Sequence, residues 1–60
     1  MDPEAQQMCD TMEKLLEIND GETAWNLTSE FGRVWNKQQP NSKEREAMAV
    51  VWNKAMIKWH

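Results

Sequence analysis

The chain has 60 residues, enough for one small domain whose core rarely supplies more than about 3–5 kcal/mol of stability. A single cysteine excludes a disulfide framework, and one cysteine with one histidine cannot supply the four ligands of a structural zinc site. The net charge is −3, and 40% of the residues are hydrophobic, with four tryptophans and five methionines, so dense packing or association must stabilise the fold.

The first helix is expected over residues 3–18. Asp2 suits the N-cap and Pro3 suits the first helical position. Apolar residues then recur at steps of three and four, which predicts one buried face comprising Ala5, Met8, Cys9, Met12, Leu15 and Leu16. The helix is expected to end at Asn19-Asp20-Gly21, with Gly21 in the left-handed cap conformation.

The second helix is expected over residues 22–37, with Asp20 or Thr23 as its N-cap. Its predicted buried face comprises Ala24, Leu27, Phe31, Val34 and Trp35, with Trp25 at the edge. Gly32 lies inside this helix at a cost of about 1 kcal/mol relative to alanine, and close approach of a neighbouring helix is the expected reason. Gln38-Gln39-Pro40 ends the helix.

The third helix is expected over residues 42–59, where Asn41 and Glu44 resemble a capping box and Ser42 is the other candidate cap. Its inner face, within about 60° of Met48 on a helical wheel, comprises Val51, Trp52, Ala55 and Trp59. The connections between helices are short, as in bundles of antiparallel neighbours. The sequence therefore predicts an all-α, compact three-helix bundle in which residues 1–60 form a single domain.

The tetrapeptide Val-Trp-Asn-Lys occurs twice, at residues 34–37 and 51–54. Four consecutive residues make about one helical turn, so the two apolar residues face the core while asparagine and lysine face water. The residues that precede the two copies differ, which favours two similar amphipathic turns over a duplicated binding motif.

The third helix carries apolar residues on a second side. Val50 and Ile57 fall opposite Met48, two turns apart, with Lys54 between them. Two exposed aliphatic residues are also normal on a protein surface. A helix that is apolar on two faces is usually buried on both, which favours a surface for a partner. Its candidate binding residues are Val50, Lys54, Met56, Ile57, Lys58 and Trp59.

The first functional hypothesis follows from this surface: a protein–protein interaction module that binds a larger protein through its third helix and modulates it, as an inhibitor or an adaptor. Phage and bacterial modulators of host enzymes include proteins of this size and composition, an analogy of size and composition only. The alternative occupant of the same surface is a second copy of the chain, which makes a homodimer.

The second hypothesis is a helix-turn-helix DNA-binding regulator built from the second and third helices. Residues 1–32 hold eight acidic residues against one basic residue, and residues 33–60 hold six basic against two acidic. The basic half offers phosphate contacts from Arg33, Lys37, Lys43 and Arg45, with Lys54 and Lys58 further along. The negative net charge and the glycine-free connection weigh against this hypothesis, and the two halves can instead pair with each other.

Neither catalysis nor a cofactor is expected. The only histidine is His60, and Cys9 lies in an apolar face beside Asp10 and Glu13, which raise a thiol pKa. The row Asp10, Glu13 and Glu17 is more typical of a solvated helix face than of a metal site. No apolar run reaches the ~18 residues of a membrane span and no signal peptide is recognised, so a cytoplasmic location is expected.

Overall fold

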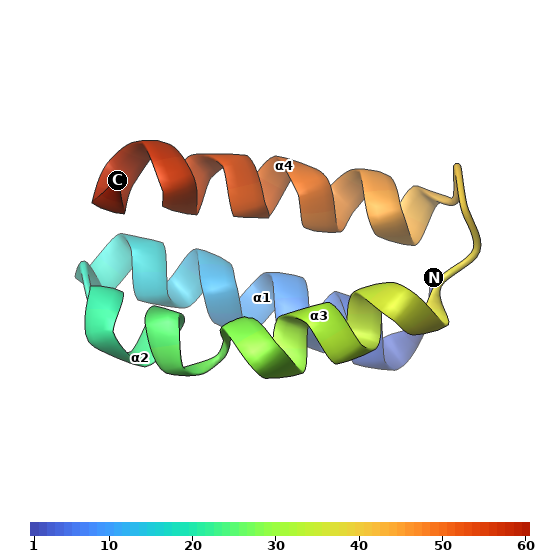
Figure 1. The fold of residues 1–60 in the computed structure, drawn as a ribbon, viewed down its shortest axis with the longest axis horizontal. Coiled ribbons are helices and arrows are strands. Elements are labelled where there is room, and N and C mark those ends of the chain that lie inside the picture. Colours follow the sequence, from blue (N-terminus) through green and yellow to red (C-terminus); the bar gives the residue numbers. More distant parts are fainter.

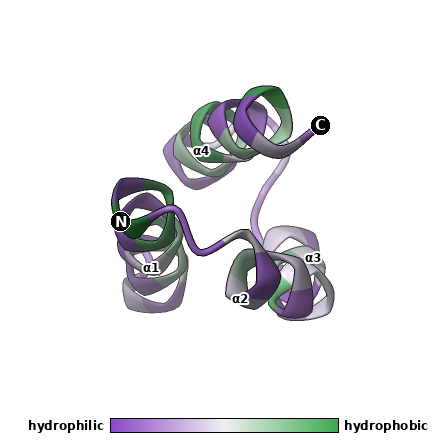
Figure 2. Ribbon diagram, turned by 90° about the vertical axis from the view of Figure 1, so that its left-hand side faces the viewer, coloured by the Kyte–Doolittle hydropathy of each residue, from purple (hydrophilic) through white to green (hydrophobic).

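The computed structural model describes residues 1–60 and contains four helices: α1 (Pro3–Ile18), α2 (Gly21–Asn26), α3 (Thr28–Lys37) and α4 (Lys43–Trp59). In Figure 1, α1 and α4 run in the same direction, while α2 and α3 follow one another in the opposite direction. Seen from the end in Figure 2, α1, α4 and the α2–α3 pair occupy the corners of a triangle. The predicted all-α class is confirmed, but the predicted number of three helices is wrong because the second helix is broken.

The break lies at Leu27, whose backbone (φ −92°, ψ 0°) closes α2 and opens α3. The Thr28 hydroxyl donates a hydrogen bond of 2.8 Å to the carbonyl of Trp25. In a continuous helix this carbonyl would accept from a backbone N–H, so the threonine side chain competes with the helix for it. Leu27 in turn accepts from the Phe31 N–H at 2.8 Å, which starts the next helix. Threonine and serine are modest helix formers, so two consecutive residues of this kind make the interruption inexpensive.

The N-caps of α1, α2 and α4 are residues that the sequence offered, and the residue that ends α1 differs from the expected one. Asp2 and Asp20 cap α1 and α2 as expected, each accepting from a backbone N–H. The left-handed residue after α1 is Asn19 (φ 59°, ψ 42°), not Gly21, because asparagine also tolerates this conformation. Of the two candidate caps of α4, the structure has Ser42, which accepts from the Arg45 N–H at 3.2 Å, and the capping box that Asn41 and Glu44 resemble does not form.

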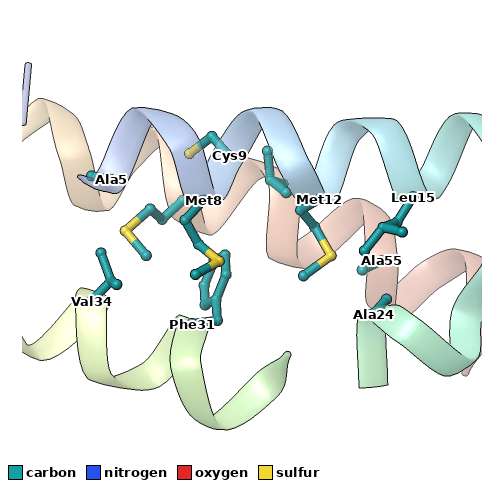
Figure 3. Packing of buried hydrophobic residues seen from close by; sticks show 11 residues of the cluster. Ala5, Met8, Cys9, Met12, Leu15, Ala24, Phe31, Val34 and Ala55 are labelled. Atoms are coloured by element: carbon teal, nitrogen blue, oxygen red, sulfur yellow. The ribbon is translucent and has the colours of Figure 1, made fainter. Parts of the chain in front are cut away.

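The core consists of eleven buried side chains drawn from all four helices: Ala5, Met8, Cys9, Met12, Leu15, Ala24, Phe31, Val34, Met48, Val51 and Ala55. In Figure 3, the α1 methionines Met8 and Met12 point toward the α2–α3 side, and Met8 reaches Phe31. Every one of these residues belongs to a predicted inner face. In both Val-Trp-Asn-Lys turns the valine is buried, the tryptophan half-buried and the last two residues exposed, as predicted.

A hydrogen-bonded cluster joins the three corners at one end of the bundle. The Gln38 amide donates to Asp2 Oδ2 at 3.0 Å and to the Val34 carbonyl at 3.1 Å. The backbone N–H of Asp2 donates to Glu44 Oε2 at 2.8 Å. Gln38 is the one buried polar residue, and its hydrogen bond is the main reason that the pKa of Asp2 lies below its usual value.

Candidate docking face on α4

The outer side of α4 carries large apolar residues that the bundle leaves in solvent. Ile57 is 83% exposed, Val50 51% and Met56 49%, and Asn53 is also exposed. Together with the half-buried Ala49 they follow steps of three and four, and these five residues are called the outer stripe below. The predicted exposure of Val50 and Ile57 is confirmed. Figure 2 shows hydrophobic ribbon on the side of α4 that faces away from the other helices.

A groove runs beside this stripe, between α4 and the α2–α3 pair. Near the end of α4 it forms a mostly apolar hollow of about 190 Å³, lined by residues that include Met12, Trp25, Trp52 and Met56. A second hollow of about 380 Å³ continues beside α3, lined by residues that include Phe31, Gly32, Trp52 and Asn53. Thr28 and Trp52 line both hollows, so the two lie next to each other, and together they are called the groove.

Trp25 stands on the rim of this groove with 74% of its surface exposed, more than any other aromatic residue of the chain. The sequence predicted Trp25 at the edge of the core. That prediction used a helical wheel for one continuous helix over residues 22–37, whereas Trp25 belongs to the separate short helix α2. An exposed tryptophan beside an apolar groove is a residue type and a position typical of binding sites. Trp25 therefore joins the candidate binding residues.

Gly32 lies in the wall of the second hollow. A Cβ atom added to Gly32 would meet nothing within 4 Å, so the expected close approach of a neighbouring helix is wrong. The space beside this glycine is part of the groove, and the fold itself gains no packing from the missing side chain.

Trp59 and Gly21 form a structural contact at the other end of the groove. The Trp59 indole donates to Asn19 Oδ1 at 3.1 Å, and a Cβ on Gly21 would lie 3.0 Å from the same indole nitrogen. Gly21 is therefore needed for the ring to approach the turn between α1 and α2. This contact holds the last turn of α4 in place, so Trp59 supports the docking face more than it extends it.

The lysines of the predicted surface lie on the α1 side of α4. Lys54 Nζ makes an ion pair of 3.1 Å with Glu13. Lys54, Ile57 and Lys58 border a shallow hollow of about 830 Å³ whose other wall holds the α1 carboxylates Asp10, Glu13 and Glu17. The predicted binding residues thus lie around α4 from the groove to the α1 side, with Val50 and Ile57 in between.

The basic residues of the alternative hypothesis mostly make contacts with other residues of the same chain, at the surface of the bundle. Arg33 pairs with Glu4 at 2.7 Å and also with Glu30, and Lys37 pairs with Glu4 at 3.2 Å. Hydrogen bonds from Arg33 lower the pKa of both carboxyl groups. These contacts join the acidic and basic halves of the chain within one molecule.

Arg45 and Lys43 stand at the start of α4. The guanidinium of Arg45 lies 4.8 Å from the centre of the Trp35 ring, and its Nε donates to the Trp35 carbonyl at 3.2 Å. This cation–π contact joins α3 to α4 at their nearest ends. Lys43 is exposed and makes no ion pair.

The remaining groups offer little reactive chemistry. Cys9 is buried in the core, and burial, then Asp10 and Glu13, raises the pKa of its thiol, which disfavours the reactive thiolate. No three metal-ligating side chains gather at one place. The helices are all too short or too polar to span a bilayer.

Comparisons of this chain with protein-family models, with curated proteins and with solved structures find no match.

Proposed function

We propose that this chain is a protein–protein interaction module that docks onto a larger protein through α4 and modulates it. One observation carries the proposal: α4 leaves Val50, Met56 and Ile57 in solvent although the core holds only eleven side chains. Burying an aliphatic side chain of this size contributes about 1.5–3 kcal/mol, which a small domain would use if the fold allowed it. A partner that covers the outer stripe recovers this energy.

The mechanism is helix packing against an apolar surface of the partner. Ile57 and Val50 are the central anchors, and Met56 adapts its shape at the mouth of the groove. Lys54 and Lys58 stand at the rim, where they favour a partner with acidic residues around its apolar site. If the docking site overlaps the active site of the larger protein, the chain acts as an inhibitor. If the docking site lies away from the active site, the chain acts as an adaptor.

Binding to nucleic acid receives less support from the geometry. A helix-turn-helix crosses its two helices at about 90–120°, whereas Figure 1 shows α3 and α4 running roughly antiparallel. Arg33 and Lys37 would have to leave Glu4 before they reached phosphate. Titration of a DNA duplex at low salt tests this alternative, which requires affinity that falls steeply as salt is raised.

The test of the proposal is capture from the lysate of the native host, with and without nuclease. The wild-type chain is compared with the double variant Val50→Asp/Ile57→Asp, whose exposed positions leave the core intact. The matched control is Ile18→Asp, an exposed aliphatic residue on α1. We expect one partner that survives nuclease, is lost with the double variant and is kept with the control. Equal capture by all three chains would refute a docking role for the outer stripe.

A further inference from the structure

The outer stripe has a self-complementary residue order. Asn53 stands at its centre, Val50 and Met56 lie three residues before and after it, and Ala49 and Ile57 lie four residues before and after it. When two copies of α4 pack antiparallel with a two-fold axis at Asn53, Ala49 of each copy faces Ile57 of the other. Val50 then faces Met56, and the two Asn53 side chains face each other. A patch that matches itself in this way is what a two-fold dimer interface requires.

We propose that a second copy of the chain covers this face, forming an antiparallel α4–α4 dimer centred on Asn53. The inference goes beyond the proposed function, because it names a second occupant of the same stripe. It stands on the order of the residues and on the groove, and not on the existence of a larger partner.

The shapes of the facing residues agree with this arrangement. Ile57 is the most exposed large apolar residue, and it faces the smallest residue of the stripe, Ala49. Ala49 borders the hollow of about 380 Å³ in which Gly32 leaves open space. Ile57 of the second copy therefore enters a depression rather than meeting a bulky side chain, as a knob enters a hole.

The parallel arrangement lacks this fit. It would place Ile57 against Ile57 and Ala49 against Ala49, which leaves a bulge at one layer and a void at another. It would also bring the two Glu46 carboxylates together. In the antiparallel arrangement Glu46 faces His60, seven residues from the centre on the other side, and an imidazole N–H donates to a carboxylate. Charge and volume thus both favour the antiparallel dimer.

Asn53 explains why this interface has one register. Asn53 lies on the two-fold axis, so the two amides can donate to and accept from each other, and any shift of register leaves them unpaired. The same polar pair weakens the dimer relative to an apolar one. One helix and part of a groove also make an interface near or below the low end of the usual ~1,200–2,000 Å², so the dimer should dissociate in the micromolar range. A larger partner would then compete with the second copy for the stripe.

Sedimentation equilibrium from about 1 µM to about 1 mM chain tests the dimer. We expect a reversible monomer–dimer equilibrium for the wild type. Ile57→Lys should raise the dissociation constant by at least about tenfold, while the matched control Ile18→Lys leaves it unchanged. Both sites are exposed and near a helix C-terminus, so circular dichroism should show intact helix in both variants. A wild type that stays monomeric throughout, or an equal effect of both substitutions, would overturn the proposal.

Mixing two variants tests the antiparallel register. A chain with Ile57→Lys and a chain with Ala49→Glu should each dimerise poorly, but their mixture should associate because lysine then faces glutamate across the axis. In a parallel dimer the two new charges lie eight residues apart along the seam, so lysine does not face glutamate and the mixture is not rescued. Absence of rescue would overturn the proposed register. The capture experiment above is read separately, so a monomeric chain that still captures its partner would sink the dimer alone.

Discussion

The two sides of α4 differ in how they meet the rest of the bundle. Toward α1 the helix buries Val51, and it adds the Lys54–Glu13 ion pair and the hydrogen bond from the Asp2 N–H to Glu44. Toward α2 and α3 it leaves a groove, with Met56 and Trp25 exposed and open space beside Gly32. Phe31 and Trp52, with ring centres 5.1 Å apart, bridge this groove at its middle.

The difference separates stability from binding within one helix. Fully buried side chains make dispersion contacts all round, so their loss leaves a cavity that the fold cannot close. Side chains at the groove and outer stripe already face water, so their loss costs the fold little. The closed side of α4 should therefore respond to mutation as a core, and the open side as a free surface whose residues matter for association.

The largest expected effect compares two methionines on α4. Met48 is fully buried, so Met48→Ala should cost about 2–5 kcal/mol, comparable with the stability of such a small domain. Met56 is half exposed, so Met56→Ala should cost less than about 1 kcal/mol. Urea denaturation followed by circular dichroism measures both. Similar losses for the two variants would show that the two sides of α4 contribute alike.

The next effect concerns the end of the bundle at which the hydrogen-bonded cluster around Asp2 joins α1, α3 and α4. Asp2→Ala removes a helix cap and leaves the buried amide of Gln38 with only its bond to Val34, so the melting temperature should fall by roughly 5 °C. Glu17→Ala is the control, since Glu17 is exposed and makes no hydrogen bond or ion pair, and it should melt as the wild type does.

Low pH should reduce the stability that the cluster around Asp2 contributes to the fold. The pKa values of Asp2 and Glu44 are lowered in the folded chain, by hydrogen bonds from Gln38 and from the Asp2 backbone respectively. A lowered folded pKa gives stability that is present above the unfolded pKa, about 4, and is lost as the pH falls through the folded value. Melting curves between about pH 6 and pH 2 should show this fall below about pH 4, and it should be shallower for Asp2→Ala.

The inner faces could be predicted from the sequence because helical periodicity depends only on local spacing. Met48, Val51 and Ala55 are buried as expected, and Val50 and Ile57 are exposed as expected. The break at Leu27 was missed because it depends on one hydroxyl, that of Thr28, choosing a backbone acceptor. Whether these exposed residues bind a partner remains a prediction.

Tertiary distances account for the other differences. Gln38 was expected only to end a helix, because its partner Asp2 lies 36 residues away. Gly32 was expected at a close helix contact, but the spacing of α3 and α4 is set by Trp35, Trp52 and Phe31 around it. The groove follows from that spacing, which no single-helix pattern contains.

A smaller effect compares the two glycines. Gly32→Ala should stabilise the chain by about 0.5–1 kcal/mol at a concentration where it is monomeric, because alanine favours the helix and the added methyl group meets nothing. Gly21→Ala should give no such gain, because its Cβ would press against Trp59 at 3.0 Å. Thermal unfolding of both variants measures the difference. A loss of stability for Gly32→Ala would mean that the groove is closed in solution.

The smallest effect belongs to the Lys54–Glu13 ion pair on the closed side. Both side chains are about half exposed, so a double-mutant cycle with Lys54→Ala and Glu13→Ala should give a coupling of about 0.2–1 kcal/mol that shrinks with added salt. Small coupling has a consequence for binding, since Lys54 then leaves Glu13 at little cost and can turn toward an acidic partner beside the outer stripe. A coupling well above this range would tie Lys54 to α1 and remove it from the docking face.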